Sequence, residues 1–190
     1  MALASSQSLP SLQSLARISL FAALVGVLGL LPKIDLPVGV PITAQTLGVM
    51  LAGCLLGPAR AFLALLLFLG AVALGLPLLT GGRGGLGVFM APSAGFLLGF
   101  PVGAAVTGLA MRKLPGPVLA RAAVASALGG IGAVYLCGVP VLAATAQLNW
   151  HGALIASSMF LPGDLVKCVL SAFLVQTVLR GLPEWQPHGG

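Results

Sequence analysis

A run of 42 residues between Arg121 and Asp164 contains no Asp, Glu, Lys or Arg, whereas one membrane-spanning helix needs only about 20 apolar residues. Only 6% of the 190 residues are charged, and 58% are hydrophobic. A soluble globular domain typically carries about 25% charged residues, because its surface must face water. We therefore expect an all-α membrane protein whose surface largely faces lipid.

Isolated charges, glycines and prolines divide the chain into six predicted membrane helices. They run approximately over Ala16–Leu31, Thr43–Leu56, Arg60–Leu76, Ser93–Ala110, Val118–Ala144 and Pro162–Leu179. The first is interpreted as a span rather than a signal peptide, since no cleavage site of the A-x-A type follows it. The cluster Gln147–His151 is predicted to be an interfacial loop. The expected organisation is one compact six-helix domain at residues 16–181, with tails at residues 1–15 and 182–190.

The basic residues predict the orientation of this bundle. Six spans place both termini on one side of the membrane. That side would hold Arg17, Arg60, Arg112, Lys113, Arg121 and Arg180, and the other side Lys33, Arg83 and Lys167. Because loops rich in Lys and Arg favour the cytoplasm, this division predicts cytoplasmic termini. With five or seven spans, the basic residues would not divide between the two sides in this way.

Several classes of function find no support in the residues. The net charge of +6 comes from scattered bases rather than from a patch, which argues against a nucleic-acid partner. Cys54, Cys137 and Cys168 lie in apolar runs without metal-ligand spacing, so no metal site is expected. We find no catalytic arrangement and no G-K-[ST] phosphate loop, and therefore expect neither an enzyme nor an ATPase.

Asp164 and Lys167 are the charged residues that the topology needs least. Ionisable groups in or beside a span are costly and often mark a pathway or a binding site. The segment from Pro162 to Lys167 starts a predicted helix and places both side chains on one face at i, i+3 spacing. They could simply pair with each other. Together they would also suit a small ligand that carries both hydrogen-bond donors and acceptors.

Arg83 lies in the middle of the glycine-rich segment Gly81–Gly87. This segment formally matches G-x-G-x-x-G, but the βαβ unit that a dinucleotide site requires is missing. Either the segment is an ordinary flexible loop, or Gly82, Gly84 and Gly85 let the backbone approach a ligand. In the second case, the guanidinium of Arg83 would suit a carboxylate.

Two further groups of residues are weaker candidates. Gln45, together with Thr43 and Thr46, begins the second predicted span, where these side chains could line a cavity, cap the helix or join helices. On the first span, Ser19 and Ala23 form a small-x-x-x-small step, as do Ala22 and Gly26. Such steps allow another helix to approach closely, within the chain or from a partner.

Four segments resemble those of a known family, and together they extend over nearly the whole chain. They are Pro41–Gly48 (PITAQTLG), Leu56–Pro58 (LGP), Gly81–Gly87 (GGRGGLG) and Pro162–Lys167 (PGDLVK). In this order and at these separations they resemble BioY proteins, the biotin-specific substrate-binding subunits (S-components) of energy-coupling factor (ECF) transporters. A carrier of another small vitamin would explain the spans and charges, but not these motifs.

The resemblance implies a six-helix bundle in the bacterial cytoplasmic membrane that holds biotin near its outer face. It implies no cofactor, since biotin is the transported substrate. Arg83, Asp164 and Lys167 correspond to the family's binding residues. We expect Asp164 to face the ureido N–H groups and the two cations to serve the acceptor ends. Which cation binds the carboxylate stays open at this point.

The family also has partners: a transmembrane coupling subunit and two ATPase subunits, although some members are reported to work without them. Its first helix docks on the coupling subunit through an A-x-x-x-A pattern. The nearest match here is Ser19-x-x-x-Ala23, which departs from that pattern at its first position.

Overall fold

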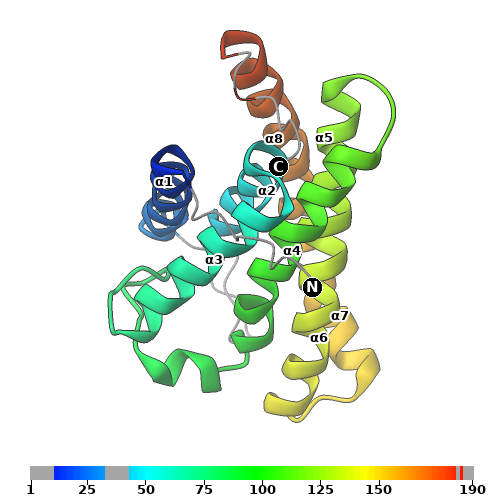
Figure 1. The fold of residues 1–190 in the computed structure, drawn as a ribbon. Coiled ribbons are helices and arrows are strands. Elements are labelled where there is room, and N and C mark those ends of the chain that lie inside the picture. Colours follow the sequence, from blue (N-terminus) through cyan, green and yellow to red (C-terminus); the bar gives the residue numbers. More distant parts are fainter. Residues whose placement is uncertain (1–10, 33–42, 183–184, 186–190) are drawn as a thin grey trace, which may run out of the picture.

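The computed structural model describes residues 11–32, 43–182 and 185, and within them the chain is helical without a β-strand (Figure 1). The α-helices are α1 (Leu12–Gly29), α2 (Gln45–Leu56), α3 (Pro58–Ala73), α4 (Ala94–Lys113), α5 (Val118–Ser126), α6 (Val134–Thr145), α7 (Trp150–Ser158) and α8 (Leu161–Gly181). A 3₁₀ helix, η1 (Leu86–Met90), precedes α4. A π-helix, η2 (Ala127–Ala133), joins α5 and α6 into one continuous rod.

Each of the six predicted spans corresponds to a helix or to this rod, but the described residues contain one helix more. The predicted interfacial loop is wrong in its second half, because α7 begins at Trp150. The reason is a local N-cap: the side-chain oxygen of Asn149 accepts a hydrogen bond from the backbone N–H of Gly152 at 2.7 Å. The first helix also begins at Leu12 rather than near Ala16. Lys33 and most of the proline-rich loop after it lie outside the described residues.

The helices have the length and composition of a multi-pass membrane protein. Four helical segments are long and apolar enough to cross a membrane: α1, α4, the α5–α6 rod and α8; α2 and α3 are shorter. Large apolar side chains point outward on α3 and α8, for example Leu63, Leu66, Val166 and Phe173. Helices that are apolar on all sides belong in lipid rather than in water.

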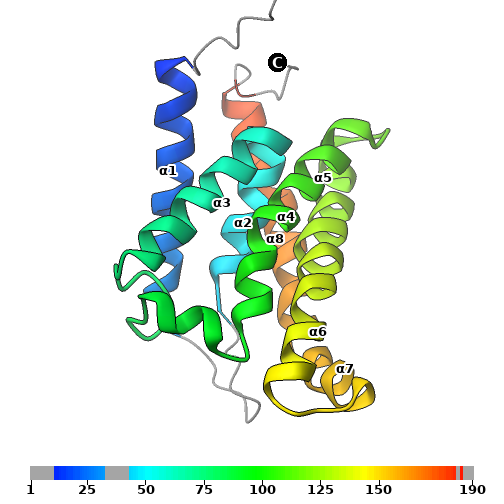
Figure 2. The same cartoon turned by 60° about the horizontal axis from the view of Figure 1, so that its bottom comes forward.

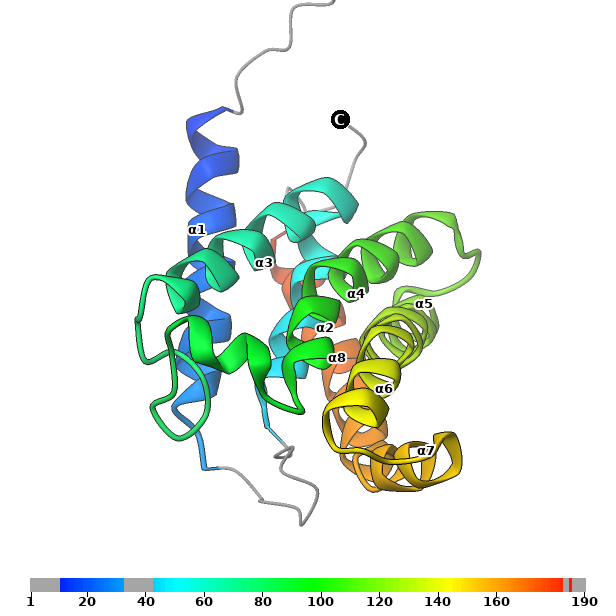
Figure 3. The ribbon, with the colours of Figure 1, turned by 90° about the horizontal axis from the view of Figure 1, so that it is seen from below.

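The start of α1 and the end of α8 lie at the same end of the bundle, at the top of Figure 2. We call this the termini end. At the other end, which Figure 3 shows from below, lie the start of α2, η1 and the start of α8. Leu12 and Gly181 therefore lie at one end of the bundle.

A stripe of glycines sets the close packing of α4 against the α5–α6 rod. Gly95, Gly99 and Gly103 recur every fourth residue on α4 and face the rod. A Cβ atom added at Gly103 would lie 2.5 Å from the side chain of Val134, and one at Gly95 would lie 2.6 Å from the carbonyl of Cys137. Small residues allow this approach, which is a common basis of helix association in membranes.

Candidate functional site

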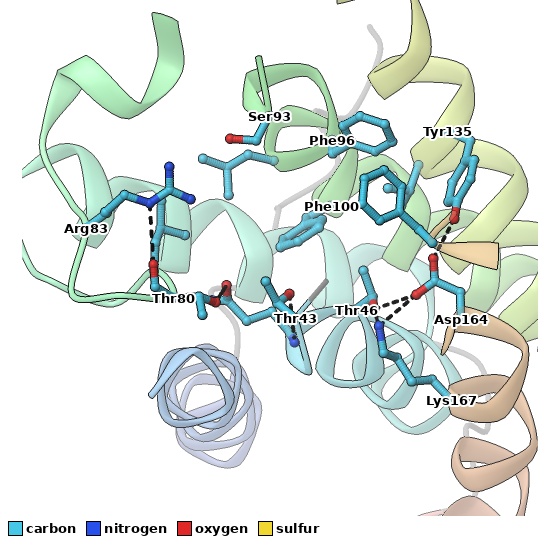
Figure 4. A pocket seen from close by; sticks show the side chains of 15 residues that line it. Thr43, Thr46, Thr80, Arg83, Ser93, Phe96, Phe100, Tyr135, Asp164 and Lys167 are labelled. Carbon is cyan, nitrogen blue, oxygen red and sulfur yellow. Dashed lines mark hydrogen bonds and ion pairs between the residues drawn. The ribbon is translucent and has the colours of Figure 1, made fainter. Parts of the chain in front are cut away.

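A cavity lies at the end of the bundle opposite the termini end, and five parts of the chain line it. Its polar lining consists of Thr43, Gln45, Thr46, Thr80, Arg83, Ser93, Tyr135, Asp164 and Lys167, and its apolar lining of Leu79, Phe96, Leu97, Phe100, Val134 and Phe160. These residues come from α2, the segment before η1, the start of α4, the start of α6 and the start of α8 (Figure 4).

The carboxylate of Asp164 is the centre of a hydrogen-bond network. Its Oδ2 accepts a hydrogen bond from the hydroxyl of Tyr135 at 2.7 Å. Its Oδ1 accepts from Thr46 Oγ1 at 3.1 Å and from Lys167 Nζ at 2.8 Å. Lys167 also donates to Thr46 Oγ1 at 2.9 Å. Asp164 is only 3% exposed, and its ion pair with Lys167 compensates the cost of burying its charge.

Within the described residues, some hydrogen-bond donors and acceptors of this network have no partner. A carboxylate has about four acceptor sites, and Asp164 uses three of them. An ammonium has three N–H donors, and Lys167 uses two. The hydroxyl of Tyr135 donates its proton to Asp164, and its oxygen can still accept a hydrogen bond. This corner of the cavity can therefore receive two donors and offer one.

Aromatic rings form the apolar wall beside this network. The rings of Phe96 and Tyr135 meet edge to face with centroids 5.7 Å apart, and those of Phe96 and Phe160 are 5.9 Å apart. Phe100 lies on the same wall (Figure 4). Rings packed against one another in this way form a rigid surface for the apolar part of a ligand.

The π-helix η2 ends at Ala133, directly before Val134 and Tyr135, both of which line the cavity. A π-turn holds more residues than an α-turn and so rotates the side chains that follow it. At Gly129 the backbone approaches α4 closely, and at Gly130 it approaches Met50, so a larger residue would clash at either position. Tyr135, the second residue after this distortion, points toward Asp164 (Figure 4).

Arg83 lies on the opposite side of the cavity from Asp164 and Lys167 (Figure 4). Its backbone pairs with Leu79 through two hydrogen bonds of 3.0 and 3.2 Å. Among the described residues, its side chain makes one hydrogen bond, from Nε to the carbonyl of Thr80 at 3.4 Å. The terminal nitrogens of the guanidinium therefore stay available to a ligand.

The glycines around Arg83 shape this loop. The N–H of Gly85 donates to the carbonyl of Val72 at 2.7 Å, with a φ of +81° that favours glycine. A Cβ at Gly84 would collide with the carbonyl of Leu76. Gly82, Gly84 and Gly85 are not among the lining residues, so their direct contact with a ligand stays a prediction.

Gln45 fastens the Arg83 loop to α1 and α2. Its Nε2 donates to the carbonyls of Val25 (3.3 Å) and Leu78 (3.2 Å). Its Oε1 accepts from the buried hydroxyl of Thr80 at 3.3 Å. Gln45 lines the cavity, as expected from sequence, and also holds the backbone that carries the Arg83 side chain.

The structure thus brings the main sequence candidates to one cavity. The predicted Asp164–Lys167 pair is confirmed, and both residues lie in the first turns of α8. Tyr135 was missed, although it is the only tyrosine of the chain and lies within an otherwise uncharged span. Ser19 and Ala23 lie on the exposed face of α1, whereas Ala22 and Gly26 are buried in the bundle. No group of three potential metal ligands occurs among the described residues.

The model of the BioY family matches residues 4–184 of the chain. The chain belongs to the BioY family. Two similar relatives are the biotin transporter BioY of Rhizobium etli, 45% identical over 91% of this chain and 96% of the relative, and that of Rhodobacter capsulatus, 44% identical over 88% and 93%.

The fold is also shared with a solved structure. A crystal structure at 2.1 Å of the S-component for biotin from an ECF-type ABC transporter matches with a TM-score of 0.84 and 28% identity. The match covers 100% of this chain and 97% of the other. The S-component fold is therefore established for this BioY protein.

Proposed function

We propose that this BioY protein binds biotin in the cavity and carries it across the bacterial cytoplasmic membrane. The main support for this proposal is the unused hydrogen-bonding capacity around Asp164. A ureido group offers two N–H donors and one carbonyl acceptor. Asp164 and Tyr135 would accept from the two N–H groups, and the unused N–H of Lys167 would donate to the carbonyl.

The opposite end of the cavity supports the orientation of the ligand. The valerate carboxylate of biotin would lie at Arg83, because a guanidinium binds a carboxylate through paired hydrogen bonds. Lys167 has one N–H left after its hydrogen bonds to Asp164 and Thr46, so it cannot offer a carboxylate the paired donors that Arg83 can. The bicyclic ring would then contact Phe96, Phe100 and Phe160 between the two polar ends. The solved relative with the same fold is an S-component for biotin, which supports this choice of substrate.

The comparison with this relative also supports a larger assembly. We infer that the chain works with an ECF coupling subunit and two ATPase subunits, since it has no phosphate-binding loop of its own. The Ser19–Ala23 face of α1 is exposed and could receive the coupling subunit. Six spans with cytoplasmic termini agree with the basic residues near the termini end.

The test is equilibrium binding of radiolabelled biotin to the purified protein, with biotin amide as a competitor that lacks the carboxylate. We expect saturable binding and a preference for biotin over the amide of roughly tenfold or more, the value of a charge-assisted hydrogen bond. Arg83→Gln should weaken biotin and remove this preference, while leaving the affinity for the amide nearly unchanged.

Arg112→Gln is the matched control, because Arg112 is exposed at the end of α4, at the termini end. It should leave both affinities unchanged. If Arg83→Gln weakens biotin and its amide equally, Arg83 does not bind the carboxylate. If the folded wild type binds no biotin, the substrate is wrong, and other small vitamins should be screened.

A further inference from the structure

A second concave site lies at the termini end, far from the cavity. It is a groove between α5 and α8, closed on one side by Met111 at the end of α4. Its polar lining consists of Arg121, Gln176 and Arg180, with no carboxylate among the lining residues. The groove is therefore positively charged as well as largely apolar.

Two polar atoms of this groove lack a hydrogen-bond partner among the described residues. They are Nε of Arg121, a donor, and Oε1 of Gln176, an acceptor, and both atoms are buried. The other end of the guanidinium is used, since Nη2 of Arg121 donates to the carbonyl of Met111. Buried polar groups are nearly always paired in folded proteins, so these two atoms leave unused hydrogen-bonding capacity beside the two arginines of the groove.

The order of residues along the groove indicates the chemistry of an occupant. Arg180 is in the last turn of α8, and Gln176 lies one turn further into the bundle. Phe173 and Val169 follow, roughly 10 and 16 Å from Arg180 at a rise of 1.5 Å per residue. Both apolar side chains are more than half exposed. Cationic, then polar, then apolar groups match the headgroup, glycerol and acyl chain of a phospholipid.

We propose that this groove binds one anionic phospholipid. Its phosphate lies on Arg121 and Arg180, the amide N–H of Gln176 donates to an ester carbonyl of the glycerol region, and an acyl chain lies along Phe173 and Val169. The two arginines supply the charge complementarity that selects an anionic headgroup. The site would anchor the α5–α8 side of the bundle in the leaflet at the termini end, independently of the ligand cavity.

The experiment is native mass spectrometry of the full chain in detergent, after addition of phosphatidylglycerol, phosphatidylcholine or free glycerol phosphate. We expect one retained phosphatidylglycerol, with at least about tenfold less phosphatidylcholine and no bound glycerol phosphate. Arg180→Gln and Arg121→Gln should lower the retained phosphatidylglycerol to the level of phosphatidylcholine, and Gln176→Leu should lower it severalfold. Arg112→Gln, which changes an exposed arginine at the same end of the bundle, should retain it fully.

Thermal melting of each variant checks its folding without relying on biotin binding. Arg180 is exposed, so Arg180→Gln tests the site even if Arg121→Gln fails to fold. Equal lipid retention by the wild type and all variants would overturn the proposal, as would an equal loss in Arg112→Gln. Displacement of the lipid by glycerol phosphate would indicate a site for soluble anions. Variants that keep the lipid but no longer co-purify with coupling subunits would assign the groove to a protein partner instead.

Discussion

At one end of the ligand cavity, Asp164 is held by side chains from three helices, whereas at the other end Arg83 is carried by a glycine-rich loop. Thr46 of α2, Tyr135 of α6 and Lys167 of α8 all bond to the Asp164 carboxylate or to each other. The Arg83 side chain makes one hydrogen bond among the described residues, to the backbone of its own loop.

This difference separates two kinds of ligand recognition. Groups on packed helices keep their geometry before a ligand arrives, and so they can discriminate between similar hydrogen-bond patterns. A long side chain on a loop can follow a flexible part of a ligand, such as a valerate chain. The end of the cavity around Asp164, which is built from helices, should therefore decide which ring system binds. The end around Arg83, which is built from a loop and is called the loop-built end below, should select for the carboxylate.

The largest effect on binding is expected for Asp164→Asn. This change keeps the shape of the side chain but replaces one acceptor oxygen with a donor and leaves the charge of Lys167 unpaired. Loss of a hydrogen bond to a charged group should weaken biotin binding by about 1.5–3 kcal/mol, or roughly 10- to 150-fold. Equilibrium binding measures this change, and the affinity for biotin amide should fall by the same factor. Unchanged affinity would remove Asp164 from the site.

A smaller effect is expected for Tyr135→Phe, which deletes one hydroxyl and keeps the ring packed on Phe96. The carboxylate loses the 2.7 Å hydrogen bond to Oδ2, and the ligand loses an acceptor. We expect a loss of about 1 kcal/mol, or roughly fivefold. Because both residues belong to one network, the loss in the double variant with Asp164→Asn should be less than the sum. Strict additivity would show that Tyr135 acts separately from Asp164.

The smallest effect is expected for Gln45→Leu, which acts on the loop-built end through Thr80. Leucine has a similar size but cannot bond to Val25, Leu78 or Thr80. We expect biotin to bind roughly threefold more weakly and the amide to be almost unaffected, as befits an indirect loss of less than one neutral hydrogen bond. A matching loss for the amide would mean that Gln45 contacts the ring end instead. The competition assay used for Arg83→Gln distinguishes these results.

Much of the helix pattern was predictable, because apolar runs of span length leave few alternatives in a chain with so little charge. The ends were harder to predict. The N-cap of Asn149 and the start of α1 at Leu12 depend on local hydrogen bonds, which shift a boundary by a few residues without changing the overall hydropathy. For the same reason the first two residues of α7, Trp150 and His151, were taken for part of a loop.

The candidate site was predictable where its residues were chemically conspicuous. Asp164, Lys167 and Arg83 stand out because a charge beside a span is costly. Tyr135 and the aromatic wall do not, since an aromatic residue in an apolar helix looks the same whether it faces lipid or a cavity. The π-helix before Tyr135 and the glycine stripe on α4 pack against segments far away in the chain, and such contacts cannot be inferred from local sequence.

The sequence by itself determined that this is a helical membrane protein, with Asp164 and Lys167 paired at the start of its last helix, and four motifs carried the resemblance to BioY. Apolar runs, charge and i, i+3 spacing are local properties, and a reader of the chain can evaluate them directly. Only the tertiary structure decided that Arg83 faces that pair from across the cavity, that Tyr135 completes it, and that Arg121 and Gln176 share a groove. Side chains far apart in the chain meet only when the helices pack, and local spacing does not encode their distances.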